Sequence, residues 1–263
     1  MRDRSFSRVR PQALLAAVAL VAVAMSLVSC RSGRIREDPI LRLSSAESLV
    51  EGKRLLELEK YEKAIPYLSH AFEVEPNSAG GREALLLVAD AHYKGGSDSD
   101  MIQAEAKYRD FQNRFPTSPR ASYVQFQIAM SLAGRIERPD RDQAPTHKAR
   151  AAFEDLLRLY PTSEYAVQAR EELVVVLDRL AEHEFVIGRF YLRYGAPSAA
   201  VTRIEGMLKN FPDYTQKDKA LFHLAQAYEK LERTDDAQAT WSRLRTEYPG
   251  SEWTSKIPEE RRG

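Results

Sequence analysis

The sequence predicts an all-α fold, a right-handed superhelical solenoid of five tetratricopeptide-like helix pairs over residues of about 44–255. Two observations predict this fold class: five prolines recur at intervals of 37 to 51 residues, and an alanine precedes each of these five by twelve residues. The alanine–proline pairs are Ala64 and Pro76, Ala104 and Pro116, Ala149 and Pro161, Ala200 and Pro212, and Ala237 and Pro249. Four residues after each alanine comes a large apolar residue: Leu68, Tyr108, Phe153, Ile204 and Trp241.

This spacing has a physical explanation if each alanine lies on a helix. Residues four apart share one face of a helix, so the alanine and the large residue point together at a neighbouring helix. The small side chain permits close approach, and the large one fills the adjoining groove. Proline then ends the helix, because it lacks an N–H and restricts the residue before it. The alternative is an ordinary helical bundle in which the prolines fall in register by chance.

The repeats differ in how well they match the pattern and in their length. The last repeat matches best, at Leu221, Leu224, Ala225, Tyr228, Ala237, Trp241, Leu244 and Pro249, and the first is marked by Gly52, Ala64, Ala71 and Pro76. The third contains an extra polar stretch, residues 134–147. The fourth is predicted to have a longer first helix, roughly residues 163–193, with Ser163 as its N-cap and a Gly-Ala-Pro turn at 195–197.

The N-terminal segment is predicted to be a signal peptide, residues 1–29, that is removed from the mature chain. Four arginines precede an apolar run, "ALLAAVALVAVAMSLVSC" at residues 13–30, which ends in the only cysteine. Leu27-Val28-Ser29-Cys30 matches the lipobox of bacterial lipoproteins. The match implies an S-linked diacylglycerol and an N-acyl chain (palmitate) on Cys30, which together anchor a protein stably in a membrane. The alternative is a stray cysteine beside an ordinary cleavage site.

The remaining termini are predicted to lie outside the solenoid. Residues 30–43 are interpreted as a lipidated flexible tether, and residues 256–263 as a short polar tail. The acidic and basic residues nearly balance, 38 against 39, and the predicted signal peptide removes a net positive charge from the mature chain. This composition lacks the basic excess of a nucleic-acid-binding protein, so no nucleic acid is expected as a partner.

No enzyme motif is found in the sequence. The five histidines are scattered, and there is no phosphate-binding glycine loop, nucleophile elbow or Cys/His cluster. The stretch "EHE" at 182–184 raises the possibility of a metal site, but adjacent helix residues point in different directions, and a solvated helix face is favoured. We therefore expect no catalytic residues, no metal, and no cofactor other than the covalent lipid.

The stretch at 178–214, "DRLAEHEFVIGRFYLRYGAPSAAVTRIEGMLKNFPDY", resembles the BamD family of lipoproteins of the outer-membrane β-barrel assembly machinery. The residues that carry the resemblance include "DRLA" at 178–181 and "RIEGML" at 203–208. Upstream, "DRD" at 140–142 and "ARAAFEDL" at 149–156 also look like the family. With the lipobox and the five repeats, the resemblance extends from about residue 30 to about residue 255.

The resemblance implies a function and a division of labour. The chain would be a scaffold lipoprotein at the periplasmic face of the outer membrane that helps to fold and insert outer-membrane proteins. Residues 44–161 would face unfolded outer-membrane proteins, with the substrate site on the concave face, and residues 162–255 would dock onto a periplasmic POTRA domain of BamA. Other lipoproteins of the machinery are possible partners. The alternative is another envelope lipoprotein that acts as an adaptor or glycan-binding organiser without BamA.

The resemblance also implies which residues bind BamA. Arg203 corresponds to an arginine of the family at that interface, and its neighbourhood supplies the other candidates. These are Glu205, Asp178, Arg179 and Glu184. The alternative for Arg203 is an intramolecular salt bridge, either to Glu205 or to an acidic residue of the long preceding helix.

Overall fold

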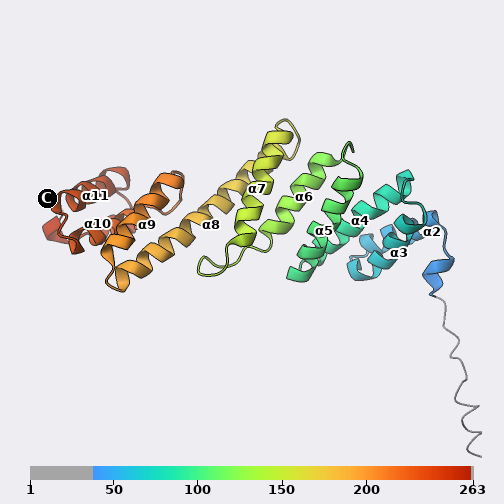
Figure 1. Ribbon diagram of the computed structural model, residues 1–263, viewed down its shortest axis with the longest axis horizontal. Coiled ribbons are helices and arrows are strands. Elements are labelled where there is room, and N and C mark those ends of the chain that lie inside the picture. The colour runs from blue at the N-terminus through green and yellow to red at the C-terminus, as the bar shows by residue number, and fades with distance from the viewer. Residues whose placement is uncertain (1–37, 262–263) are drawn as a thin grey trace, which may run out of the picture. The chain divides into compact units, whose positions relative to one another are not determined.

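The computed structural model describes residues 38–261, which contain helices and no strand (Figure 1). From residue 43 onward they form one unit in which each helix packs against the next along the chain. The five pairs are α2 (Ser45–Glu57) with α3 (Tyr61–Val74), α4 (Ala79–Gly95) with α5 (Asp98–Arg114), α6 (Ala121–Ala133) with α7 (Ala144–Leu159), α8 (Ala166–Arg193) with α9 (Pro197–Asn210), and α10 (Lys217–Lys230) with α11 (Thr234–Glu247). The predicted solenoid of five helix pairs is therefore confirmed.

The repeat positions predicted from the sequence form the core of the second helix in each pair. All five alanines and all five large residues are buried, and none is more than 4 % exposed. Each helix ends two residues before its proline, and the residue between the helix end and the proline has φ between −127° and −137° and ψ between 55° and 69°. This backbone is not helical, and a following proline disfavours the helical region at the residue before it, so the prolines terminate the helices as predicted.

Serine side chains cap some of the helices, but Ser163 does not. Ser44, Ser78 and Ser97 each accept a hydrogen bond from the first turn of the helix that follows. By contrast, α8 begins at Ala166, and the hydroxyl oxygen of Ser163 is buried without a hydrogen-bond partner among residues 38–261. The predicted N-cap is wrong because the Ser163 backbone N–H donates to Tyr160 O (3.1 Å), which forms a turn before α8 can start.

The long helix α8 belongs to two separate regions of the core. Its first half, with Ala169 and Val176, packs into the core of the second and third repeats. Its second half, with Ala181 and Phe185, packs into the core of the fourth and fifth repeats. In the described part of the chain, α8 is the only helix with residues in both regions.

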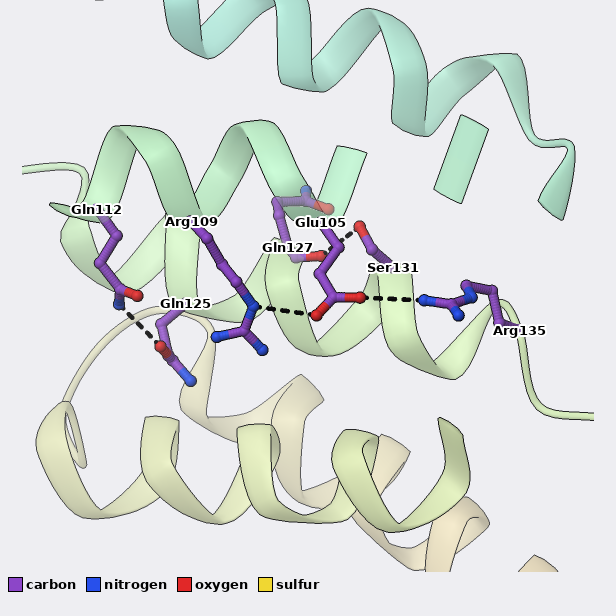
Figure 2. Close-up of polar contacts among 7 residues, drawn as sticks. All are labelled: Glu105, Arg109, Gln112, Gln125, Gln127, Ser131 and Arg135. Atoms are coloured by element: carbon purple, nitrogen blue, oxygen red, sulfur yellow. Dashed lines mark hydrogen bonds and ion pairs between the residues drawn. The ribbon is translucent and has the colours of Figure 1, made fainter. Parts of the chain in front are cut away.

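Polar side chains also connect successive helices in the middle repeats, as Figure 2 shows. Glu105 on α5 accepts from Arg109 of the same helix and from Arg135 at the end of α6, each at 3.0 Å. Gln112 on α5 donates to the buried Gln125 on α6, which in turn donates to the backbone of α7. Because buried amides must be hydrogen-bonded, this chain of contacts fixes how the three helices align.

The extra stretch of the third repeat supports α8 from outside the helix pairs. Ile136 packs against the core of the second and third repeats, and Asp142 accepts from the backbone N–H of Ala144 at the start of α7. The carbonyl oxygen of Pro139 lies 2.5 Å from His183 Nδ1 on α8. The insertion therefore joins α8 near its middle to the preceding repeat.

The two ends of the described chain refine the predicted boundaries. A short helix, η1 (Pro39–Arg42), lies in the segment interpreted as a tether. At the other end, α12 (Glu252–Ser255) is followed by Ile257, which is 1 % exposed and packs with Leu221 and Phe222 of α10. Ile257 thus corrects the expectation of a polar tail from residue 256, because its apolar side chain closes the end of the last pair. The second short helix, η2 (Glu259–Arg261), follows it.

Candidate functional site

Helices α8 and α9 bring together two of the five residues expected to bind BamA. Arg203 Nη1 donates to Glu184 Oε2 at 2.7 Å, and the two side chains are 41 % and 29 % exposed. The helices can approach this closely because Gly188 faces Ile204: a Cβ at Gly188 would lie 2.6 Å from Ile204 Cγ1. The contact is the intramolecular salt bridge to the preceding helix, and its acidic partner is Glu184 and not Glu205.

The other three residues expected at this site do not join the pair. Asp178 accepts from the backbone N–H and the hydroxyl of Thr215, at 2.8 and 2.9 Å, and so fixes the start of the fifth repeat. Glu205 accepts from the hydroxyl of Tyr228 on α10. Burial and this hydrogen bond raise the pKa of Tyr228 to about 12. Arg179 is exposed on α8. The structure therefore separates the Arg203–Glu184 pair from Asp178 and Glu205, which join the fourth and fifth repeats, and from the exposed Arg179.

The stretch at 182–184 is not the solvated helix face that the sequence favoured. Glu182 accepts from the hydroxyl of Tyr214 and from Lys219 (2.9 Å), His183 contacts Pro139, and Glu184 holds Arg203. The three side chains point to three different segments, as adjacent helix positions must. Within residues 38–261 there is no group of His, Cys, Asp and Glu side chains suited to a metal ion.

The Glu184–Arg203 pair lies at the edge of a groove of about 580 Å³ between α8 and α9. Its lining mixes polar, small and aromatic side chains. The lining residues are Glu184, Tyr191, Ala199, Thr202, Arg203, Gly206, Met207, Asn210 and Phe211. Analysis of the sequence did not assign Tyr191 and Phe211 to the site. In the sequence they are marked only as large aromatic residues, Tyr191 shortly before the Gly-Ala-Pro turn and Phe211 directly before the repeat proline.

Arg203 keeps most of its hydrogen-bonding capacity at this groove. A guanidinium has five N–H donors in a planar fork. Among residues 38–261, Arg203 makes one hydrogen bond, to Glu184. Its remaining donors and its partial exposure allow a second carboxylate to bind, which would place the positive charge between two acceptors.

The half of the chain expected to face substrate contains a buried carboxylate. Asp90 on α4 accepts from the hydroxyls of Tyr108 on α5 and Tyr123 on α6, each at 2.6 Å. Burial raises the pKa of Asp90, and burial beside this carboxylate also raises the pKa of Tyr108. Like the network of Figure 2, this cluster joins three helices from within. It accounts for the alignment of the second and third repeats without defining a substrate site.

These features define a class: a helical-repeat protein of the tetratricopeptide type, with a polar and aromatic groove on its fourth repeat. The chain belongs to the YfiO family, described as outer membrane lipoprotein, whose model matches residues 43–244. Within residues 38–261, no helix combines the length and the apolar character that crossing a bilayer requires.

Relatives with high coverage share one description. The outer membrane protein assembly factor BamD of Caulobacter vibrioides is 29 % identical over 238 residues, which cover 90 % of this chain and 77 % of that protein. The protein of the same description from Haemophilus influenzae is 30 % identical over 233 residues, covering 85 % and 87 %. Among solved structures, the TPR2AB domain of yeast Sti1 in complex with pHSP90 is 17 % identical, covers 78 % of each chain, and has a TM-score of 0.42.

Proposed function

We propose that this chain is an outer membrane protein assembly factor, a scaffold that binds BamA and unfolded outer-membrane proteins and assists their folding and insertion. The family and the description of its relatives support this role, and the alignments span most of the length of both chains. The protein acts at the periplasmic face of the outer membrane. It can contact the other lipoproteins of the machinery along the same series of repeats.

The observation that carries the BamA part of the proposal is the half-exposed Glu184–Arg203 pair at the α8–α9 groove. An incoming carboxylate of a POTRA domain would complete the hydrogen bonds of the guanidinium, and Tyr191 and Phe211 offer apolar contact beside it. A charge pair at the edge of an apolar groove gives orientation and specificity to such a contact. Residues 162–255 are therefore the proposed BamA-docking half, and residues 44–161 the substrate-facing half.

Purification from membranes tests the proposed function directly. A tagged full-length chain, solubilised in mild detergent and captured, is expected to carry BamA in near-stoichiometric amount, as read by mass spectrometry. A tagged, unrelated lipoprotein from the same membranes serves as the control. Capture of envelope proteins without BamA would contradict the proposal and favour an adaptor that works outside the assembly machinery.

A second prediction concerns the lipid anchor at Cys30, which lies outside the described residues along with all of residues 1–29. Cys30→Ala removes the thiol that receives the diacylglycerol, so the variant is expected to lose its lipid label. Because the variant carries no acyl chain to hold it in the membrane, most of the protein should move to the soluble periplasmic fraction. Radiolabelled palmitate and fractionation measure the two effects. Cys30→Ala protein that still carries palmitate would refute the lipobox assignment.

A further inference from the structure

A second groove lies between α8 and α10 and has a different chemistry. Its volume is about 510 Å³. From α8 it is lined by Arg189, Leu192 and Arg193, and from α10 by His223, Gln226, Glu229 and Lys230. On each helix the lining residues are mostly three or four positions apart, so they share one face of that helix. The groove lies between these two faces. None of them was assigned a role by the sequence or belongs to the α8–α9 groove.

The groove has an excess of positive charge that the described part of the chain does not neutralise. Arg189, Arg193 and Lys230 are exposed, and none of the three forms an ion pair within residues 38–261. Arg189 and Arg193 lie over the rings of Phe185 and Tyr194. Lys230 Nζ reaches only the carbonyl oxygen of Leu192, at 3.4 Å, near the C-terminal end of α8. The one carboxylate of the lining, Glu229, accepts from the indole N–H of Trp241 at 3.0 Å.

His223 lies within this local positive charge. Its pKa is lowered by burial, and the positive charges of Arg189, Lys219 and Lys256 lower it further, against the opposing effect of its contact with Gln226. The imidazole is therefore neutral at pH 7. It lies among cations that stay charged, so the groove attracts anions without needing a protonated histidine.

We propose that the α8–α10 groove binds an acidic, extended peptide segment of a partner protein, with Arg189, Arg193 and Lys230 holding its carboxylates. The buried Leu192 provides an apolar floor. The Gln226 side-chain oxygen contacts His223 (3.1 Å), and among residues 38–261 its amide N–H₂ has no acceptor, so it can donate to a peptide carbonyl. Arg189 and Arg193 are four residues apart on α8, a rise of about 6 Å, and alternate residues of an extended chain are about 6–7 Å apart. The two arginines therefore suit carboxylates on alternate residues of an extended peptide.

The proposal is independent of BamA docking, because Arg203 and Glu184 line the other groove. Arg189→Glu combined with Arg193→Glu reverses two charges and leaves every ion pair of the described chain in place. The probe is a fluorescein-labelled decapeptide of alternating Glu and Gly, titrated by fluorescence anisotropy into the full mature lipoprotein in detergent. We expect saturable binding that weakens with added salt, and at least a tenfold loss of affinity in the double variant.

Matched controls separate the groove from overall charge. Arg141→Glu with Arg170→Glu makes the same change in net charge on exposed residues away from the groove, and it should leave the affinity within twofold. A decapeptide of alternating Gln and Gly should not bind. If the glutamate variant melts at a lower temperature, Arg189→Gln with Arg193→Gln replaces it, with a loss of affinity still expected.

Three outcomes would overturn the proposal. The first is an equal loss of affinity in the two charge-reversed variants, which would mean nonspecific attraction. The second is unchanged affinity in the groove variants. The third is that the peptide does not bind, whereas the Cys30→Ala chain binds phosphatidylglycerol vesicles and this binding depends on Arg189 and Arg193. That result would make the groove a lipid site.

Discussion

Arg203→Glu is expected to weaken binding to the periplasmic POTRA region of BamA by about 2 kcal/mol or more, roughly 30-fold. The substitution removes the donors that face the α8–α9 groove and puts a carboxylate where the partner's carboxylate would bind. Folding should survive, because the pair with Glu184 is 41 % and 29 % exposed, and exposed ion pairs contribute about 1 kcal/mol or less. Surface plasmon resonance measures the affinity, and circular dichroism measures the melting temperature.

Two further variants distinguish an interface residue from a structural one. Lys209→Glu makes the same charge change on the exposed face of α9 outside this groove, and its affinity for BamA should equal that of the unaltered chain. Glu184→Arg combined with Arg203→Glu exchanges the partners, so it should restore the intramolecular pair and the melting temperature without restoring affinity. Full recovery of BamA binding in the exchanged variant would show that Arg203 acts only within the chain.

Trp241→Ala is expected to lower the free energy of unfolding by about 3–5 kcal/mol, the usual cost of removing a large aromatic side chain from a core. Trp241 is 1 % exposed, packs edge-on against Phe222 with ring centroids 5.3 Å apart, and donates its indole N–H to Glu229. Its loss leaves a cavity between α10, α11 and the segment that contains Ile257. Urea unfolding followed by circular dichroism gives the free energy.

The companion variant Trp241→Phe keeps an aromatic ring in place and removes the indole N–H. It should cost less than half as much as the alanine variant, since most of the apolar contact remains. A loss below about 1 kcal/mol in Trp241→Ala would mean that the fifth repeat contributes little to the cooperative unit. In that case the contacts of Trp241 would stabilise only the fifth repeat and not the whole solenoid.

The sequence was sufficient to predict the solenoid because its rule is local. An alanine, a large residue one turn later and a proline at the end of the helix specify each pair through helix geometry alone, and Ala149, Phe153 and Pro161 behave as predicted. Ser163 shows the limit of such rules: serine at the start of a helix is a good cap, but here a backbone turn from Tyr160 takes precedence. Capping depends on which hydrogen bonds the preceding turn has already used.

The polar contacts between helices were not predictable in the same way. That Arg203 has an acidic partner was foreseen, but choosing Glu184 over Glu205 required the closeness of α8 and α9 at Gly188. The basic α8–α10 groove was missed because nothing in the sequence distinguishes Arg189, Arg193 and Lys230 from other surface residues. Even Arg193 and Lys230, the nearest pair from the two helices, are 37 positions apart. Only the packing of the fifth repeat against the fourth brings them together.

Because α8 packs into two core regions, it can couple ligand binding in one half of the chain to ligand binding in the other. A repeat protein transmits free energy between neighbours through their shared interfaces. In the described part of the chain, the two core regions are joined through the middle turns of α8, and the His183–Pro139 contact lies beside these turns. If binding at one end alters affinity at the other, the coupling free energy is reciprocal. Substitutions at residues 177–180, which join Val176 in one core region to Ala181 in the other, are therefore expected to change that coupling.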